Sequence, residues 1–284
     1  MAQQLVRDET TCIEVLAYGV PFNYDDRSGN WTPWNLSIFL DGAELQAAET
    51  MVFMDGKKWS NENKIFVRLR QVMVMNPEVF KYNHMTRAKL QITQTLEKVG
   101  TTSLIFRTKL KDVNTETILV DRYMMVVGMN ASSRRPEKHA DWFIQKYSGL
   151  KDTEVPLMTK SEIPTPPFNC FTQTLVVRYS DLDYNYHTNQ SVYIKICHDC
   201  AAAACNSKKL LPFEGDISLY PILFIDVRYL GETLAEDKLS INVWQDDADL
   251  ATLKFVIYKD ERKVNYTVMK LDLQKSNSNS QSKL

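Results

Sequence analysis

Residues 177–194 read VRYSDLDYNYHTNQSVYI, and this stretch decides how the rest of the chain is interpreted. A short strand-like run leads into a polar loop that carries a carboxylate, an amide and an imidazole at alternate positions, Asp183, Asn185 and His187. Asn189 is a preferred helix N-cap residue, and the apolar spacing after it predicts a helix. Alternate side chains of an extended segment point to one side, so we expect the three polar groups to share a face.

These residue types suit the transfer of an acyl group to water. A carboxylate can act as a base or as a nucleophile on an acyl carbon, an amide can position water, and an imidazole can shuttle a proton near neutral pH. The N–H groups of Gln190 and Ser191, at the helix start behind Asn189, would hold a developing oxyanion.

The same loop also has a purely structural interpretation, in which its side chains satisfy backbone groups and cap the helix. For Asp181 and Asn189 we favour that interpretation, because Asx residues form such local hydrogen bonds readily. For Asp183 with His187, chemistry alone leaves the two interpretations even.

Two segments of the chain share one order of elements: a strand, an irregular loop, a helix and then several strands. In the first, periodicity predicts strands at 11–18, 64–76, 84–100, 103–111 and 117–128 and a helix at 35–50. In the second, it predicts strands at 171–180, 220–231, 237–246, 250–259 and 263–274 and a helix at 190–208. A further helix is expected after Pro136, within residues 132–148.

These elements predict two domains. We place the first at residues 1–150, a proline-bearing linker at 151–164 and the second at 165–274. The polar residues 275–284 are expected to be a flexible tail.

The pattern Asp-Leu-Asp-x-Asn-x-His-x-Asn at residues 181–189, with Tyr193-Ile194 and Asp199 after it, resembles the hotdog-fold acyl thioesterases. The similarity is closest to the plant-type acyl-ACP thioesterases and the 4-hydroxybenzoyl-CoA thioesterase group. The resemblance implies an α+β fold, a double hotdog, in which each half wraps a curved antiparallel sheet around a long helix. It places the acyl site at the interface of the halves. It also implies catalytic roles for Asp183, Asn185 and His187, with Asn189 at the helix start.

Two departures from the family pattern stand out. Plant-type enzymes carry a Glu-Cys pair on the strand after the helix, whereas Tyr229 and Leu230 stand at those places here. Asp226 and Glu232 are nearby, but neither matches. The first half has no His-x-Asn and reads NYDDRSGNW at residues 23–31, so we expect a degenerate, non-catalytic first half.

The composition excludes several other classes of protein. The 34 Lys+Arg are balanced by 35 Asp+Glu, which argues against a nucleic-acid-binding face. No GxGxxG or GxxxxGK[ST] motif is present, and we expect no cofactor. Cys197 and Cys200 form a C-x-x-C in the predicted helix, which we interpret as packed small side chains rather than a metal site. No apolar run approaches the roughly 18 residues of a membrane span.

Residues 282–284, Ser282, Lys283 and Leu284, match a peroxisomal address that an import receptor reads. We therefore expect a peroxisomal acyl-CoA thioesterase whose partners are acyl-CoA, or a related hydrophobic small molecule, and that import receptor. A non-enzymatic binding protein for acyl or other hydrophobic ligands and a hotdog enoyl-CoA hydratase stay open as alternatives. Whether the chain forms a homo-oligomer also stays open. Four basic residues are candidates for contacts to CoA phosphates, although a solvated face explains each of them more simply: Arg68, Arg70, Lys208 and Lys209.

Overall fold

A computed structural model describes residues 3–27, 29–49, 52–60 and 63–274. The internal contacts of the chain divide it into two compact units. The first unit comprises Met1–Pro21, Ile38–Asn76 and His84–Lys160; the second comprises Phe22–Ser37, Pro77–Asn83 and Ser161–Leu284. Within the described ranges, no helix is both long enough and apolar enough to cross a membrane.

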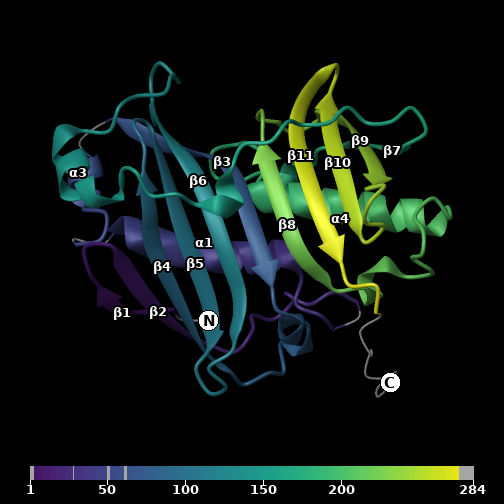
Figure 1. Ribbon diagram of the computed structural model, residues 1–284, viewed down its shortest axis with the longest axis horizontal. Helices are drawn as coiled ribbons and strands as arrows, with labels where there is room; N and C mark the ends of the chain where they lie inside the picture. Colours follow the sequence, from purple (N-terminus) through teal and green to yellow (C-terminus); the bar gives the residue numbers. More distant parts are fainter. Residues whose placement is uncertain (1–2, 28, 50–51, 61–62, 275–284) are drawn as a thin grey trace. The chain divides into compact units, whose positions relative to one another are not determined.

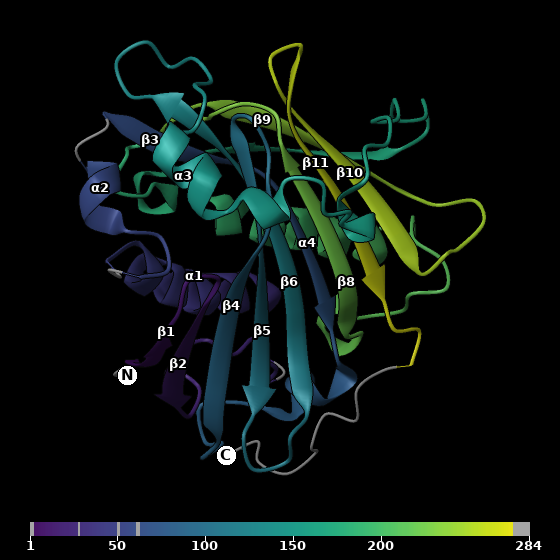
Figure 2. The same ribbon diagram turned by 60° about the vertical axis from the view of Figure 1, so that its left-hand side comes forward.

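The first unit is built on an antiparallel sheet with the strand order β1-β2-β4-β5-β6-β3 (Figures 1 and 2). Every second side chain of β2 and of most of β4 is buried, as expected for a sheet with one covered face. The strands are β1 (Gln4–Asp8), β2 (Cys12–Tyr18), β3 (Lys64–Met75), β4 (Lys89–Val99), β5 (Ser103–Asp112) and β6 (Ile118–Asn130). The helices α2 (Gly56–Ser60) and α3 (Asp141–Lys146) also belong to this unit.

The helix α1 (Pro33–Glu49) begins in residues of the second unit and continues in the first. Its buried side chains recur at helical spacing, at Leu36, Phe39, Leu40 and Ala43. The first turn of α1 has no acidic residue and its last turn has no basic residue, so no charged side chain complements the helix dipole at either end. The burial of one face therefore accounts for this 17-residue helix.

The second unit holds a five-stranded antiparallel sheet in the order β8-β11-β10-β9-β7 (Figure 1). Its strands are β7 (Phe171–Val176), β8 (Ile222–Tyr229), β9 (Lys238–Gln245), β10 (Thr252–Lys259) and β11 (Arg262–Leu271). The helix α4 (Gln190–Asn206) packs against β7, β9 and β11. Small residues on its buried face, including Cys200, Ala201 and Ala204, permit this close packing.

The α+β class is confirmed, because long antiparallel strands and few helices account for both units. The helix predicted after Pro136 is present but begins later, since α3 spans only Asp141–Lys146. Pro136 instead pairs with Met129, and the N–H of His139 donates to the carbonyl of Thr101 at 3.1 Å. These hydrogen bonds to the sheet keep residues 136–139 from joining the helix, and helix propensity alone does not predict them.

The two units are not continuous in sequence. Residues 22–37 and 77–83 group with the second unit, although both segments lie inside the 1–150 predicted for one domain. The last division, between Lys160 and Ser161, falls within the predicted linker at 151–164. The predicted tail, residues 275–284, lies outside the described residues.

Candidate functional site

The polar loop before α4 is a compact turn rather than an extended segment. The N–H of Asp183 donates to the carbonyl of His187 at 2.9 Å, and the N–H of Tyr186 donates to the carbonyl of Asp183 at 3.0 Å. Leu182 and Thr188 pair across the base of the turn as an isolated antiparallel bridge. Tyr186 takes a left-handed conformation with φ 63°, which is uncommon for a non-glycine residue and closes the turn.

Within this turn, Asp183 and Asn185 contact one another directly. The Oδ1 of Asp183 accepts the backbone N–H of Asn185 at 2.8 Å, forming an Asx turn. Asn185 is exposed, as are its sequence neighbours Tyr184 and Tyr186. The expected alternation of side chains along an extended loop is therefore wrong, and a turn brings these residues together instead.

The imidazole of His187 lies beside a carboxylate that the sequence did not single out as functional. The Nε2 of His187 is 3.3 Å from the Oε2 of Glu232, with the side chains 28% and 44% exposed. The other acid considered from the sequence, Asp226, is buried on β8 near Arg228 at 3.7 Å. Glu232 follows β8 by three residues and lies 45 positions from His187, so no local pattern could have paired them.

A cluster of buried hydroxyl groups fixes this juxtaposition. The Oγ1 of Thr233 lies 2.6 Å from the Oγ1 of Thr188 and 2.8 Å from the hydroxyl of Tyr193 on α4. The backbone N–H of Thr188 also donates to the carbonyl of Thr233 at 2.8 Å. Burial raises the pKa of Tyr193, so its hydroxyl stays protonated. Because Thr188 and Thr233 adjoin His187 and Glu232, these bonds hold the imidazole and the carboxylate side by side.

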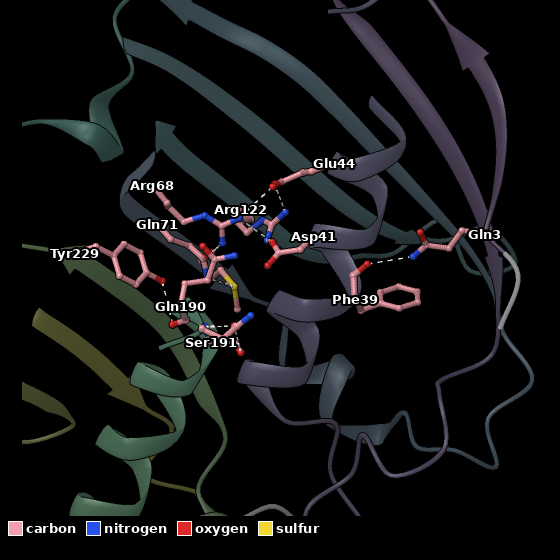
Figure 3. A network of polar contacts seen from close by, with 12 residues as sticks. Gln3, Phe39, Asp41, Glu44, Arg68, Gln71, Arg122, Gln190, Ser191 and Tyr229 are labelled. Carbon is pink, nitrogen blue, oxygen red and sulfur yellow. Dashed lines mark hydrogen bonds and ion pairs between the residues drawn. The ribbon is translucent and has the colours of Figure 1, made fainter. Parts of the chain in front are cut away.

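The start of α4 is capped as the sequence predicts. The Oδ1 of Asn189 accepts the N–H of Ser191 at 2.9 Å and its hydroxyl at 2.7 Å. The N–H of Ser191 is thus engaged in the cap, which competes with the oxyanion role predicted for it. Figure 3 shows the next contact of this helix start, in which the hydroxyl of Tyr229 donates to the carbonyl of Gln190 at 3.4 Å.

Asp181 serves the structure of the loop. Its carboxylate accepts the backbone N–H of Arg178 at 2.9 Å and two guanidinium bonds from the same residue. Burial raises the pKa of Asp181, but the hydrogen bonds from Arg178 outweigh this and hold it below its usual value. The carbonyl of Asp181 accepts the N–H of Asn189 at 2.8 Å, which ties the base of the turn to the cap.

Four charged side chains form a network in the first unit, in which Arg122 is fully buried and the other three are largely covered (Figure 3). Arg122 on β6 bonds Asp41 at 2.7 Å and also Glu44, both on α1. Arg68 on β3 contacts the same two carboxylates at 3.0 and 3.1 Å. Arg68 is thus committed to an ion-pair network, which is unlike the solvated or phosphate-binding role considered from the sequence. Arg70 donates to the carbonyl of Thr159 at 2.7 Å.

The cysteines of α4 are packed rather than reactive. Cys197 and Cys200 are buried, and the thiol of Cys200 donates to the carbonyl of Ile241 at 3.7 Å. Burial raises the pKa of Cys200 to about 12, far from a reactive thiolate. Across the part of the chain that the structure describes, no group of three or more His, Cys, Asp or Glu residues could hold a metal ion.

The sequence matches one protein family, and the fold matches solved structures. Residues 168–274 match the model of the acyl-ACP thioesterase C-terminal domain, less than half of the chain. A search of curated proteins found no match. Residues 183, 185, 187 and 232 all lie within the matched segment.

Three solved structures share the fold over nearly the whole chain. An oleoyl thioesterase from Lactobacillus plantarum has a TM-score of 0.75 at 14% identity and covers 93% of this chain and 96% of its own. An acyl-ACP thioesterase from Bacteroides thetaiotaomicron VPI-5482 has a TM-score of 0.70 at 17% identity, with 92% and 98% covered. The 12:0-ACP thioesterase from Umbellularia californica has a TM-score of 0.70 at 12% identity, with 92% and 96% covered. The chain therefore resembles the hotdog-fold acyl-ACP thioesterases, in sequence over residues 168–274 and in fold over nearly all of its length.

Proposed function

We propose that this chain is a thioester hydrolase that cleaves acyl-CoA into a free acid and CoA. The observation that carries the proposal is the pairing of His187 with Glu232, on the turn that holds Asp183 and within the segment that matches the thioesterase family. The imidazole of His187, the adjacent carboxylate of Glu232 and the carboxylate of Asp183 before α4 are the types of group that catalyse acyl transfer to water.

The proposed reaction breaks the C–S bond of the thioester. Asp183 activates a water molecule or attacks the acyl carbon itself, and Asn185 and His187 orient the reacting groups. The tetrahedral oxyanion meets the N-terminal end of α4 at Gln190, where backbone N–H groups and the helix dipole favour negative charge. In the water route, the proton that Asp183 removes from water passes through His187 to the leaving thiolate; in the direct route, water then hydrolyses the acyl–Asp183 anhydride. Glu232 lies beside the imidazole of His187 and orients it.

Release of free thiol from a panel of acyl-CoA thioesters tests this function. The purified chain should release CoA, and Asp183→Asn should lower the rate by roughly 10²–10⁴, the usual contribution of a positioned acid or base. Asp247→Asn, at an exposed turn, is the matched control and should behave as the unaltered chain does. If no acyl-CoA is hydrolysed above background, the hydrolase proposal is wrong, and copurification of an intact acyl ligand would then favour a binding protein.

The substrate carrier and the arrangement of the two units belong to the same proposal. We expect acyl-CoA rather than acyl-ACP, and a double hotdog in which α1 and α4 are the two central helices, each with its own antiparallel sheet. Hydrolysis of matched acyl-CoA and acyl-ACP substrates at equal concentration measures the first preference. A faster reaction with acyl-ACP would reverse it.

A peroxisomal location rests on Ser282, Lys283 and Leu284, which lie outside the described residues. This tripeptide acts as an address only at a free C-terminus. A fluorescent protein fused before the intact chain should therefore colocalise with peroxisomes, and removing residues 282–284 should disperse it. Equal distributions of the two fusions would refute the location.

A further inference from the structure

The loop before α1 repeats the turn that carries Asp183. The N–H of Asp26 donates to the carbonyl of Asn30 at 2.8 Å, and the N–H of Gly29 donates to the carbonyl of Asp26 at 3.0 Å. Asp25 and Trp31 pair across its base as an isolated antiparallel bridge. Gly29 has φ 78°, the left-handed conformation that closes the turn. Each of these features has a counterpart in residues 182–188.

The correspondence gives Asp26 and Asn30 of the first turn counterparts in the second. Asp26 stands where Asp183 does, because each donates to the carbonyl four residues later and accepts from the N–H three residues later. Asn30 stands in the place of His187. In both cases a helix begins two residues after the bridge, at Pro33 for α1 and at Gln190 for α4. The carboxylate of the turn is thus kept in the first half, while the imidazole is replaced by an amide.

An imidazole nevertheless reaches the first turn from another element. Asp26, Asn30 and His198 of α4 line one small cavity, whose walls include Trp34, Phe80 and Tyr220. All of these residues belong to the second unit. The cavity has a volume of about 20 Å³, room for a single water molecule or a group of similar size such as a carbonyl oxygen.

The side chains around this cavity are held in place. The ring of His198 packs on that of Trp34, with 5.3 Å between the centroids. The Nδ2 of Asn30 donates to the carbonyl of Ser218 at 3.4 Å, and the Oδ1 of Asp26 accepts the N–H of Asn30 at 3.0 Å. These contacts fix a carboxylate, an amide and an imidazole around one cavity, the same three groups that Asp183, Asn185 and His187 supply.

The charged groups near His198 favour a neutral ligand. Burial lowers the pKa of His198, although Asp199 and Asp216 oppose this effect, so the ring is neutral near pH 7 and keeps one donor and one acceptor nitrogen. Arg27, the nearby cation, is paired with Asp216 at 2.5 Å. The carboxylate of Asp26 lines the cavity and would repel an anionic ligand, whereas a thioester carbonyl carries no net charge.

We propose that Asp26, Asn30 and His198 form a second binding site for acyl thioesters, with the thioester carbonyl in the cavity and the rest of the ligand outside it. This inference rests on the proposed function, because it assigns the same substrate class to a second copy of the turn. It concerns binding, and hydrolysis stays with the turn that holds His187.

The number of ligands bound per chain tests the second site. The probe is an acyl-CoA analogue in which a methylene group replaces the sulfur, which keeps the carbonyl and prevents hydrolysis. Calorimetric titration of the full chain should give two molecules bound per chain. His198→Phe should reduce the number to one, and so should Asp26→Asn, which keeps an oxygen for the N–H of Asn30 and so preserves the turn. His187→Phe is the matched variant of the other turn and should also leave one.

The possible results separate this inference from the proposed function. If the unaltered chain hydrolyses the substrate but binds only one analogue, the second site is wrong and the hydrolase proposal stands. The same holds if it binds two analogues and both variants still bind two. Two bound analogues without hydrolysis would support the second site and refute the hydrolase. Neither binding nor hydrolysis would refute both. Unfolding curves of the two variants that match the unaltered chain show that a lost ligand is not a lost fold.

Discussion

A carboxylate beside an imidazole can fix which ring nitrogen faces the substrate. Glu232 is placed to do this for His187, at 3.3 Å. We predict that Glu232→Gln lowers kcat for thioester hydrolysis about tenfold with little change in KM. Glu232→Asp should recover part of the loss. Glu261→Gln, an exposed glutamate of the same unit, is the control. An unchanged kcat in Glu232→Gln would exclude the role of Glu232.

The candidate residues differ in how far the sequence could reveal them. Asp183, Asn185 and His187 stand within five residues of one another, so their proximity is local and a motif can show it. Glu232 reaches His187 only through the pairing of Thr188 with Thr233, a contact between segments 45 residues apart. Such a contact depends on tertiary packing, which residue spacing does not encode. The turn geometry was likewise hidden, because Tyr186 adopts a conformation that tyrosine rarely takes.

Asp181 makes the stability of this loop depend on pH. Its pKa is lower in the folded chain than the usual value of about 3.9, mainly because Arg178 bonds it. The carboxylate therefore stabilises the fold fully above about pH 4, and this stabilisation is lost as the pH falls through the lower folded pKa. We predict that Asp181→Asn costs about 1 kcal/mol at pH 7, a modest value because the guanidinium is largely exposed. Urea unfolding at pH 7 and pH 3 should show the difference shrinking in acid, and a constant difference would contradict the pairing.

At the scale of elements, hydrophobic periodicity anticipates nearly every strand and both long helices, since each element buries one face. It gives no account of Arg122, which is fully buried where α1 meets β6. The guanidinium is accommodated because Asp41 and Glu44 lie one turn apart on α1 and both face it. Burial raises the pKa of Asp41, but Arg68 and Arg122 outweigh this and hold it below its usual value.

This network predicts an asymmetric response to substitution. Arg122→Met leaves two largely covered carboxylates with one guanidinium, which should lower the free energy of unfolding by about 3 kcal/mol. Replacing Glu44 by Leu in the same chain should recover most of the loss, because Asp41 and Arg68 then remain as a balanced pair. Arg7→Met breaks two ion pairs of a half-exposed arginine, with Glu9 and Glu14, and should change little. Chemical denaturation of the three variants measures this, and a double variant no more stable than Arg122→Met would contradict the account.

At the scale of the whole molecule, the two compact units do not coincide with two consecutive pieces of the sequence. Residues 22–37 and 77–83 come from the first half of the chain but belong to the second unit. They supply buried side chains to it, among them Trp31 and Phe80, and the bond from Asn30 to the carbonyl of Ser218. A fragment of residues 161–274 therefore exposes the apolar surface that these segments cover, at a cost of about 25 cal/mol for each Å².

We predict that residues 161–274 expressed alone do not give a stable fold, and that coexpression with residues 1–160 restores a soluble complex. Circular dichroism and thermal unfolding of the fragment, alone and with its complement, measure this. Two substitutions in the complement, Trp31→Ala and Phe80→Ala, should weaken the restoration, because both rings line the cavity of the second unit. Val52→Ala, an exposed position of the first unit, should not. A fragment that unfolds cooperatively on its own, at the temperature of the full chain, would show that residues 22–37 and 77–83 contribute little to the second unit.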